Sequence, residues 1–254
     1  LYGRQPGKDF ADLLRERWEG RVGPSLCAFA LKSSLIIGAY SEETDCPDKI
    51  HIKSNGKSVL TGTTLKGAIR ARAEMIINTL GGKPELILKE FMGWVSDKSG
   101  NNKKKEKCSS RLIIEETYIE NPTEVVQQRT QISRFTAGVL NLFDSQPLWK
   151  TNNSVDMINI KITIKDYKAY EAGLILLILK DLWSGDLPIG GEKAIGRGVL
   201  DGVKAKVSFN ENTVVIINKK NNGTKLSIEG PSEKLEEFVK AFHNHIENIE
   251  NIEN

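Results

Sequence analysis

Apolar and polar residues alternate with two different periods along the chain, and these periods predict its strands and helices. Residues 156–164 alternate at every second position, which is typical of a half-buried strand. Residues 64–80 place apolar side chains three and four positions apart, which predicts a helix closed by Gly81 and Gly82. The apolar run 170–183 predicts a second, largely buried helix that ends at Gly185.

Weaker patterns complete the expected order of elements. Amphipathic helices are expected at residues 9–18 and 231–246, and a further helix at residues 135–143. The polar stretches 41–57 and 97–110 predict loops, the second of them a mobile insertion. Additional strands are expected at residues 26–37, 111–119, 199–207, 213–218 and 224–228.

This mixture of strands and helices predicts an α+β fold of the ferredoxin-like type, in which helices cover one face of an antiparallel sheet. The chain has 254 residues, enough to bury one elaborated core, and we expect one main domain. We place that domain at residues 24–205. An N-terminal helix and linker at residues 1–23 would precede it, and a C-terminal β-hairpin and helix at residues 206–254 would follow.

Composition narrows the class of protein without indicating a function. Charged residues make up 27% of the chain and hydrophobic residues 39%, the proportions of a folded, water-soluble protein. The longest apolar stretch, residues 174–179, is far shorter than the ~20 residues that span a bilayer, so we expect no membrane partner. The net charge of +3 is too small to indicate nucleic acid by itself. The lysine-rich run 103–107 fits either a solvated loop or one that faces RNA.

The cysteines and histidines give no disulfide or zinc framework. The three cysteines form no even set and no C-x-x-C pair, so we expect a reducing, cytoplasmic setting. Cys46 and His51 would supply two zinc ligands where structural zinc sites use four, and we therefore expect no zinc.

The strongest candidate for chemistry is the glycine-rich loop at residues 190–198, GGEKAIGRG. Gly190, Gly191 and Gly196 permit close approach of the backbone, so that successive N–H groups can form a concavity for a phosphate. Lys193 and Arg197 add positive charge to the same loop. The alternative is a purely structural turn between a helix and a strand.

A second basic segment lies at the start of the helix predicted for residues 64–80. Lys66, Arg70 and Arg72 lie near its N-terminus, where they oppose the helix macrodipole. Free N–H groups at that end also attract anions, and Thr64 lies among them. The segment therefore favours an anionic partner, although cations on a helix surface also serve solubility alone.

These two segments resemble motifs of one family. Residues 62–70, GTTLKGAIR, resemble the G-[ST]-[ST]-[LI]-K-G-x-[IL]-R element of the RAMP superfamily, and residues 190–198 resemble its C-terminal glycine-rich loop. Between them, residues 111–114 and 129–143 resemble the central region of the backbone subunits of type III CRISPR effectors. The resemblance spans about residues 24–205. It implies a modified RNA-recognition fold with an inserted β-hairpin, the thumb.

The resemblance implies a guide-RNA-binding subunit whose contacts reach phosphates and ignore base sequence. The thumb would lie in an insertion at about residues 97–136, with its hairpin within 121–136. The implied partners are CRISPR guide RNA, single-stranded target RNA, and neighbouring backbone subunits, other effector subunits or fused domains. The candidate RNA-binding residues are Thr64, Lys66, Arg70, Arg72, Arg129, Arg134, Gly190, Gly191, Lys193, Gly196 and Arg197.

The resemblance also implies a catalytic aspartate in the loop after the first strand. Asp48 begins the stretch DKIHIK, which is closest to the family's D-x-x-[VI]-x-[RK] pattern. Asp48 is therefore the first candidate for catalysis and for metal ligation, and Asp45 is the second. The implied reaction is cleavage of target RNA by its own 2′-OH, with Mg²⁺ or Mn²⁺ as cofactor. His51 is a weaker candidate as proton donor.

Three functions stay open from the sequence. The chain either binds guide RNA and cuts the paired target, or binds without cutting, as family members that lack the aspartate do. In the second case Asp48 would belong to turn chemistry. A third function, the processing of precursor guide RNA, would use a histidine near the first helix, and His51 is the nearest one.

Overall fold

The computed structural model describes residues 22–40, 47–95, 107–150, 157–210, 213–219 and 226–253. Three sequence-based expectations fall outside these ranges. They are the N-terminal helix at residues 9–18, the candidate Asp45, and most of the insertion expected at residues 97–110.

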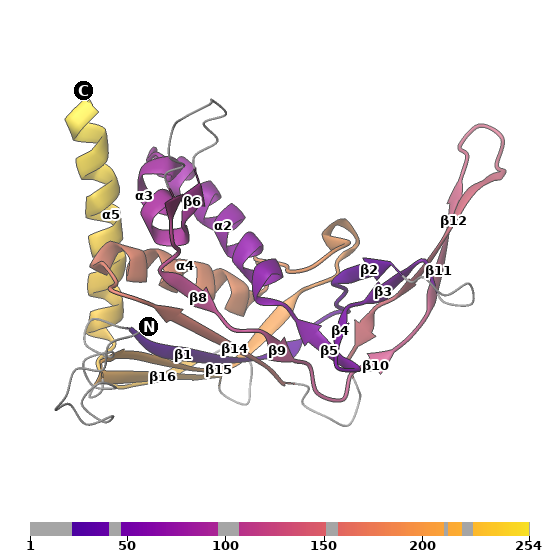
Figure 1. The fold of residues 1–254 in the computed structure, drawn as a ribbon, viewed down its shortest axis with the longest axis horizontal. Helices are drawn as coiled ribbons and strands as arrows, with labels where there is room; N and C mark the ends of the chain where they lie inside the picture. The colour runs from indigo at the N-terminus through magenta and orange to yellow at the C-terminus, as the bar shows by residue number, and fades with distance from the viewer. Residues whose placement is uncertain are drawn as a thin grey trace, which may run out of the picture.

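A six-stranded antiparallel sheet forms the body of the protein, in the order β17-β16-β15-β1-β14-β8 (Figure 1). β1 lies inside this sheet, where Cys27 pairs with Ile160 on one side and Ala205 on the other. The isoleucines at alternate positions of β14 are buried, which confirms the strand predicted from alternation. The strands are β1 (Val22–Leu31), β8 (Leu112–Ile114), β14 (Met157–Ile164), β15 (Leu200–Asn210), β16 (Thr213–Lys219) and β17 (Leu226–Glu229).

The described helices are α2 (Gly62–Thr79), α3 (Pro84–Met92), α4 (Ala169–Ser184) and α5 (Glu233–Glu253). α4 packs on the sheet, and α5 packs on α4 where Gly173 lets the backbone of Phe238 approach closely. α4 ends at the predicted Gly185, which adopts a left-handed φ of +87° and donates its N–H to Asp181 O. α2 confirms the helix predicted for residues 64–80.

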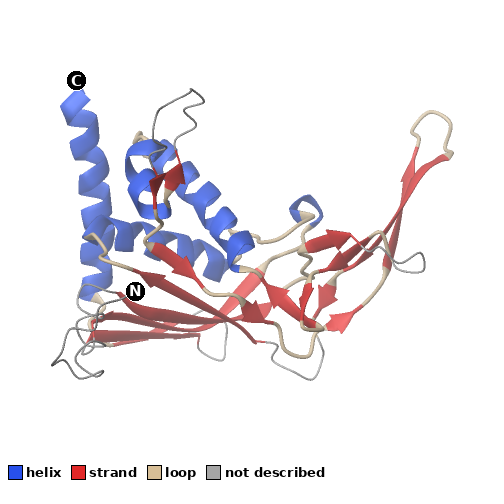
Figure 2. Cartoon of the chain, in the orientation of Figure 1, coloured by secondary structure: helices blue, strands red, loops and turns tan. Residues whose placement is uncertain are grey.

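Helices gathered on one face of an antiparallel sheet confirm the α+β fold class (Figure 2). The main core lies between them and is built from apolar side chains of β1, β14 and α4 with those of α2 and α3. None of the described helices is both long enough and apolar enough to cross a membrane.

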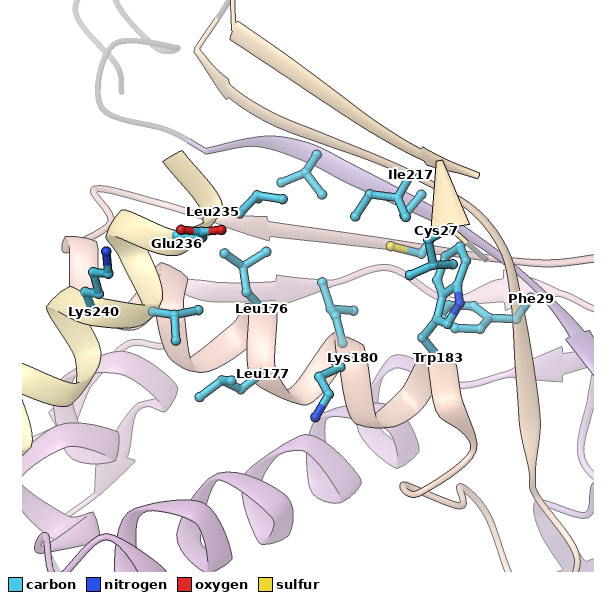
Figure 3. Close-up of a pocket in the computed structure, with 15 residues that line it drawn as sticks. Cys27, Phe29, Leu176, Leu177, Lys180, Trp183, Ile217, Leu235, Glu236 and Lys240 are labelled. Carbon is cyan, nitrogen blue, oxygen red and sulfur yellow. The ribbon is translucent and has the colours of Figure 1, made fainter. Parts of the chain in front are cut away.

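An apolar pocket of about 530 Å³ lies between the sheet, α4 and α5 (Figure 3). Cys27 and Phe29 line it from β1, and Leu176 and Trp183 line it from α4. Burial raises the pKa of the Cys27 thiol to about 12. The thiol is therefore protonated at neutral pH and packs as a small apolar group.

A second, smaller sheet carries a long hairpin that projects from the body (Figure 1). Its order is β11-β12-β3-β2, with β2 (Gly38–Tyr40), β3 (Lys49–His51), β11 (Gln127–Ile132) and β12 (Val139–Gln146). β11 and β12 form the hairpin, and β12 pairs in parallel with β3, which fixes the base of the hairpin to the body. The remaining short elements are β4 (Lys53–Ser54), β5 (Lys57–Leu60), β6 (Trp94–Val95), β7 (Lys107–Cys108), β9 (Thr117–Tyr118), β10 (Thr123–Glu124), β13 (Leu148–Trp149) and the 3₁₀ turn η1 (Lys193–Ile195).

Two expectations about local structure are wrong. Residues 135–143 are not a helix, because residues 139–146 pair with residues 127–132 across the hairpin and the chain between them turns. Residues 41–57 are not one continuous loop, since β3 and β4 form within that stretch by pairing with β2, β12 and β5. The hairpin that corresponds to the expected thumb reaches Gln146, beyond residue 136.

Candidate nucleic-acid interface

The glycine-rich loop at residues 190–198 is docked on the chain that follows β1. Gly191 N–H donates to Ile36 O and Gly198 N–H to Ser34 O, both at 2.7 Å. Gly196 N–H donates to Lys193 O at 3.0 Å within the loop itself. Three N–H groups of the loop therefore bond to carbonyl groups of the protein. These three are not free to form the open phosphate concavity that the sequence predicts.

Three glycines of this loop adopt left-handed backbone angles for different reasons. Gly190, Gly196 and Gly198 have φ of +80°, +83° and +80°. An added Cβ at Gly190 would lie 2.5 Å from Ile36 O, and one at Gly198 would overlap Ile189 O. A Cβ at Gly196 would meet no atom within 4 Å. Packing therefore requires glycine at positions 190 and 198, whereas position 196 faces open space where a ligand backbone can approach.

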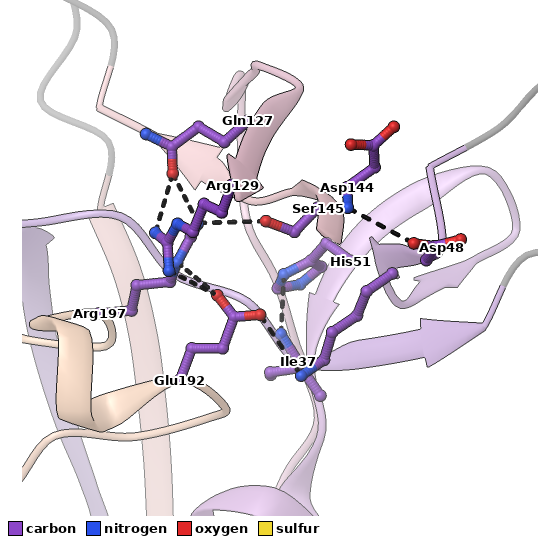
Figure 4. A network of polar contacts seen from close by, with 10 residues as sticks. Ile37, Asp48, His51, Gln127, Arg129, Asp144, Ser145, Glu192 and Arg197 are labelled. Carbon is purple, nitrogen blue, oxygen red and sulfur yellow. Dashed lines mark hydrogen bonds and ion pairs between the residues drawn. The ribbon is translucent and has the colours of Figure 1, made fainter. Parts of the chain in front are cut away.

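Arg197 connects the glycine-rich loop to the base of the hairpin (Figure 4). Its side chain is buried, at 1% relative exposure. Its Nη2 donates to Gln127 Oε1 at 2.6 Å and to Ser145 Oγ at 3.3 Å, and its Nε lies 2.8 Å from Glu192 Oε2. Burial lowers the pKa of the guanidinium, and the Glu192 carboxylate opposes that shift. Arg197 is thus an internal cation that holds three segments together.

Two more cations reach the same carboxylate. Arg129 Nη1, on β11, lies 3.7 Å from Glu192 Oε2, and Lys49 Nζ, on β3, lies 3.6 Å from Glu192 Oε1. Lys193 is exposed on η1, directly after Glu192. The predicted residues Arg129 and Arg197 therefore do come together, at the junction of hairpin, loop and β3.

The start of α2 forms a second basic group. Thr61 caps the helix by accepting from Thr64 N–H at 3.3 Å, and its hydroxyl donates to Thr64 Oγ1 at 2.8 Å. Burial lowers the pKa of Lys66, and the positive charge of Arg70 lowers it further. A nearby anion would relieve this repulsion. Arg70 is exposed and pairs with Glu74 at 3.1 Å, a surface ion pair that an RNA phosphate can replace at little cost.

Two predicted residues lie apart from these groups. Arg72 turns toward the protein, where its Nε contacts Asp181 Oδ2 of α4 at 2.8 Å. Its ion pair therefore fixes α2 to α4. Arg134 lies on the exposed turn at the tip of the hairpin.

Asp48 is exposed immediately before β3, at the base of the hairpin (Figure 4). Its Oδ2 accepts the backbone N–H of Asp144 at 3.4 Å. Within the described ranges there is no group of three or more His, Cys, Asp or Glu side chains that could hold a metal ion. Mg²⁺ commonly binds one or two carboxylates together with substrate phosphates and water. A single exposed carboxylate fits that mode, in which the RNA would supply further ligands.

His51 is a structural residue. It is 2% exposed, and its Nδ1 accepts Ile37 N–H at 3.2 Å while its Nε2 donates to Val59 O at 2.9 Å. Burial lowers its pKa, so the ring is neutral at physiological pH. Both nitrogens are occupied by backbone groups, which argues against a role as proton donor to RNA.

Four residues at this junction were not predicted from the sequence: Lys49, Gln127, Ser145 and Glu192. Each comes from a different segment, and only the pairing of β12 with β3 and the docking of the loop bring them together. Glu192 could have been noticed as the one acidic residue within the glycine-rich loop.

The fold and this junction define an α+β protein with a cluster of basic side chains, built where a glycine-rich loop meets the base of a projecting hairpin. The family model of the RAMP superfamily matches residues 29–201, and the chain belongs to that superfamily. The match includes α2, the hairpin and the glycine-rich loop. Comparison with curated proteins finds no significant match. Membership supports a CRISPR-associated RNA-binding subunit that works in a multi-subunit complex.

Proposed function

We propose that this chain is a backbone subunit of a type III CRISPR effector, which binds guide RNA through its phosphates and cuts the paired target RNA. The observation that carries the RNA-binding part is the convergence of Lys49, Arg129 and Arg197 from three separate segments. Glu192 is the carboxylate among these three cations, so the four side chains keep a net charge of +2, which attracts an anionic partner such as an RNA phosphate. Phosphate contacts suit a guide-binding subunit because they do not depend on base sequence.

The start of α2 is the second basic group, and it gives the direct test. In the double variant Lys66→Glu with Arg70→Glu, affinity for single-stranded RNA should fall by about 10- to 100-fold in low salt, because two phosphate contacts become repulsive. The slope of log affinity against log salt should decrease by about 1.4, since each contact to single-stranded RNA contributes about 0.7. Fluorescence anisotropy with a labelled RNA measures both quantities.

The matched control is Lys204→Glu with Lys206→Glu. Both lysines are exposed on β15 and flank the buried Ala205, so they face away from the helices. This control makes the same change in net charge and should leave most of the RNA affinity in place. If wild-type affinity is insensitive to salt, or if both double variants lose equal affinity, phosphate binding at α2 is refuted.

Cleavage is the second part of the proposal and centres on Asp48. The 2′-OH of the target attacks the adjacent phosphorus, its proton passes to a base, and the bond to the 5′-oxygen breaks as that oxygen takes up a proton. The products are a 2′,3′-cyclic phosphate and a 5′-hydroxyl. A divalent cation at this position would stabilise negative charge on the phosphoryl oxygens. Asp48 is suited to hold that cation or to receive the 2′-OH proton, because its carboxylate is exposed at the hairpin base.

Asp48→Ala should abolish target cleavage in the assembled effector while guide binding persists. Asp186→Ala, which removes an exposed carboxylate beyond α4, is the control and should cut normally. A single 2′-deoxy nucleotide at the cut position should also block the reaction. Cleavage that continues on the deoxy target, or products with 3′-hydroxyl ends, would show that water is the nucleophile. A wild-type effector that binds but never cuts would assign the chain to the binding-only class.

A further inference from the structure

One carboxylate lies among three cations that come from distant parts of the sequence (Figure 4). Glu192 is 2.8 Å from Arg197, 3.7 Å from Arg129 and 3.6 Å from Lys49. These four side chains together carry a net charge of +2. The carboxylate therefore neutralises only part of the positive charge around it.

Hydrogen bonding within this group is incomplete. Arg197 Nη2 has two acceptors, but the buried Nε and Nη1 of the same guanidinium make no hydrogen bond to the described residues. Glu192 Oε2 is likewise buried without a hydrogen bond to those residues, so its short contact with Arg197 is an ion pair without hydrogen-bond geometry. Buried polar atoms in native proteins are nearly always paired, and unpaired ones often belong to binding sites. The donors of Arg197 are thus suited to a ligand with more acceptor oxygens than one carboxylate offers.

The backbone at Glu192 is also unusual. Its φ is +55°, in the left-handed region that residues other than Gly, Asn and Asp seldom adopt. Such strain is retained where the surrounding structure enforces it, and it is frequent at binding sites. Here the enforced conformation turns an acidic side chain toward the hairpin base.

We infer that Glu192 is an internal occupant of a phosphate site formed by Lys49, Arg129 and Arg197, and that a phosphodiester of single-stranded RNA displaces it. A carboxylate and a phosphodiester each carry one negative charge on two terminal oxygens, so one can take the place of the other between the same cations. In the free chain Glu192 holds the cations together. In the RNA complex its side chain moves outward to solvent, which it already reaches with 23% of its surface. The inference rests on the proposed RNA binding and adds a site and a competitor to it.

Glu192→Gln tests the competition because it keeps the size of the side chain and removes its charge. Its affinity for a labelled oligouridylate in low salt should be about 5- to 10-fold higher than that of the wild type, since a competing charge is gone. The salt slope should become steeper by about 0.7, as expected for one additional phosphate contact. Glu90→Gln is the matched control, because Glu90 lies near the C-terminal end of α3 and pairs with Lys168 at 2.9 Å. It should bind as the wild type does.

A double-mutant cycle shows whether the gain arises at this site. Arg129→Gln alone should weaken binding, and the gain from Glu192→Gln should vanish when Arg129→Gln is present. Equal or weaker binding by Glu192→Gln, or a gain that survives the loss of Arg129, would overturn the inference.

Thermal melting separates competition from a structural role of Glu192. Removing the carboxylate leaves Arg197 buried without its counter-ion, so the free Glu192→Gln variant should melt at a lower temperature than the wild type. Added oligouridylate should raise the melting temperature of the variant more than that of the wild type. If the Glu192→Gln variant does not fold, Glu192→Asp takes its place in the test. Aspartate keeps the negative charge, but its shorter side chain lies farther from Arg197. Glu192→Asp should therefore give a smaller gain in RNA affinity.

The inference and the proposed function fail in different ways. A wild-type chain that does not bind RNA in a salt-dependent manner contradicts the proposed function. A wild-type chain that does, combined with a Glu192→Gln variant that gains nothing, contradicts only the role of Glu192.

Discussion

Gly196 and Gly198 offer a sharp test of how the glycine-rich loop is built, because they share a backbone conformation and differ in their neighbours. Their φ angles are +83° and +80°. Replacement by alanine costs both about 1–2 kcal/mol, the penalty of placing a Cβ in the left-handed region. At Gly196 no further cost arises, since the new Cβ meets no atom within 4 Å.

At Gly198 the new Cβ would overlap Ile189 O and lie 2.9 Å from Ile189 C. The backbone must move, which strains the Ile189 N–H bond to Gly198 O at 3.0 Å and the Gly198 N–H bond to Ser34 O at 2.7 Å. Overpacking and two weakened hydrogen bonds add about 2–4 kcal/mol to the loss for Gly198→Ala. For a chain of this size, its melting temperature should fall by roughly 5–15 °C more than that of Gly196→Ala.

Differential scanning calorimetry of the two variants measures this difference, and RNA anisotropy on the same samples measures binding. Gly196→Ala should lose RNA affinity out of proportion to its small loss of stability, because the Cβ occupies the space open to a ligand. Equal falls in melting temperature for the two variants would refute the argument from packing. Normal RNA binding by Gly196→Ala would show that position 196 does not contact the ligand.

Two further predictions follow from the ion pairs and the buried histidine. Arg72→Gln should cost about 1–2 kcal/mol of stability and leave RNA affinity unchanged, because it leaves the largely buried Asp181 without its ion-pair partner. Arg70→Gln should lower RNA affinity and leave stability unchanged. Urea denaturation measures the stability of each variant, and anisotropy measures its RNA affinity. The contribution of His51 to the free energy of unfolding should be fully present above about pH 6.5 and should decrease as the pH falls below that value. Burial lowers the pKa of His51 in the folded chain, so at lower pH the unfolded chain binds more protons than the folded chain does. His51→Gln should flatten this dependence in urea titrations at several pH values. An unchanged slope would assign the effect to His245, whose pKa burial also lowers.

The elements that the sequence predicted well are those whose periodicity reflects burial against the main core. The alternation in residues 156–164 matches β14, where each buried isoleucine faces the helices. α4 begins and ends close to its predicted bounds because Gly185 supplies the left-handed residue that closes it. Such signals are local, so a single sequence contains them.

The hairpin was misjudged because its apolar residues do not mark a buried face. Val139, Leu140, Leu142 and Phe143 are each more than half exposed. Their spacing therefore carries no information about a core, and a helix at residues 135–143 was an equally good match to the pattern. Pairing with residues 127–132 decides the conformation, and no local propensity reveals that pairing.

The basic junction was predicted only in part, for a related reason. Arg197 was a candidate from the glycine-rich loop and Arg129 from the resemblance, but the sequence does not reveal that Arg197 is buried. That burial depends on Gln127 and Ser145, which precede it by 70 and 52 positions. The charge balance around Glu192 likewise arises from tertiary contacts alone.

The interior position of β1 has a consequence for how the protein folds. β1 is the first described strand of the chain, yet its partners in the sheet, β14 and β15, begin at Met157 and Leu200. Contacts between such distant residues must overcome a large loop-closure entropy and slow folding. During synthesis, β1 has neither neighbour until β14 and β15 have left the ribosome, and its apolar side chains stay exposed for that time. The main sheet therefore forms only after β14 and β15 have been made, and a chaperone that shields β1 during synthesis should raise the yield of folded protein.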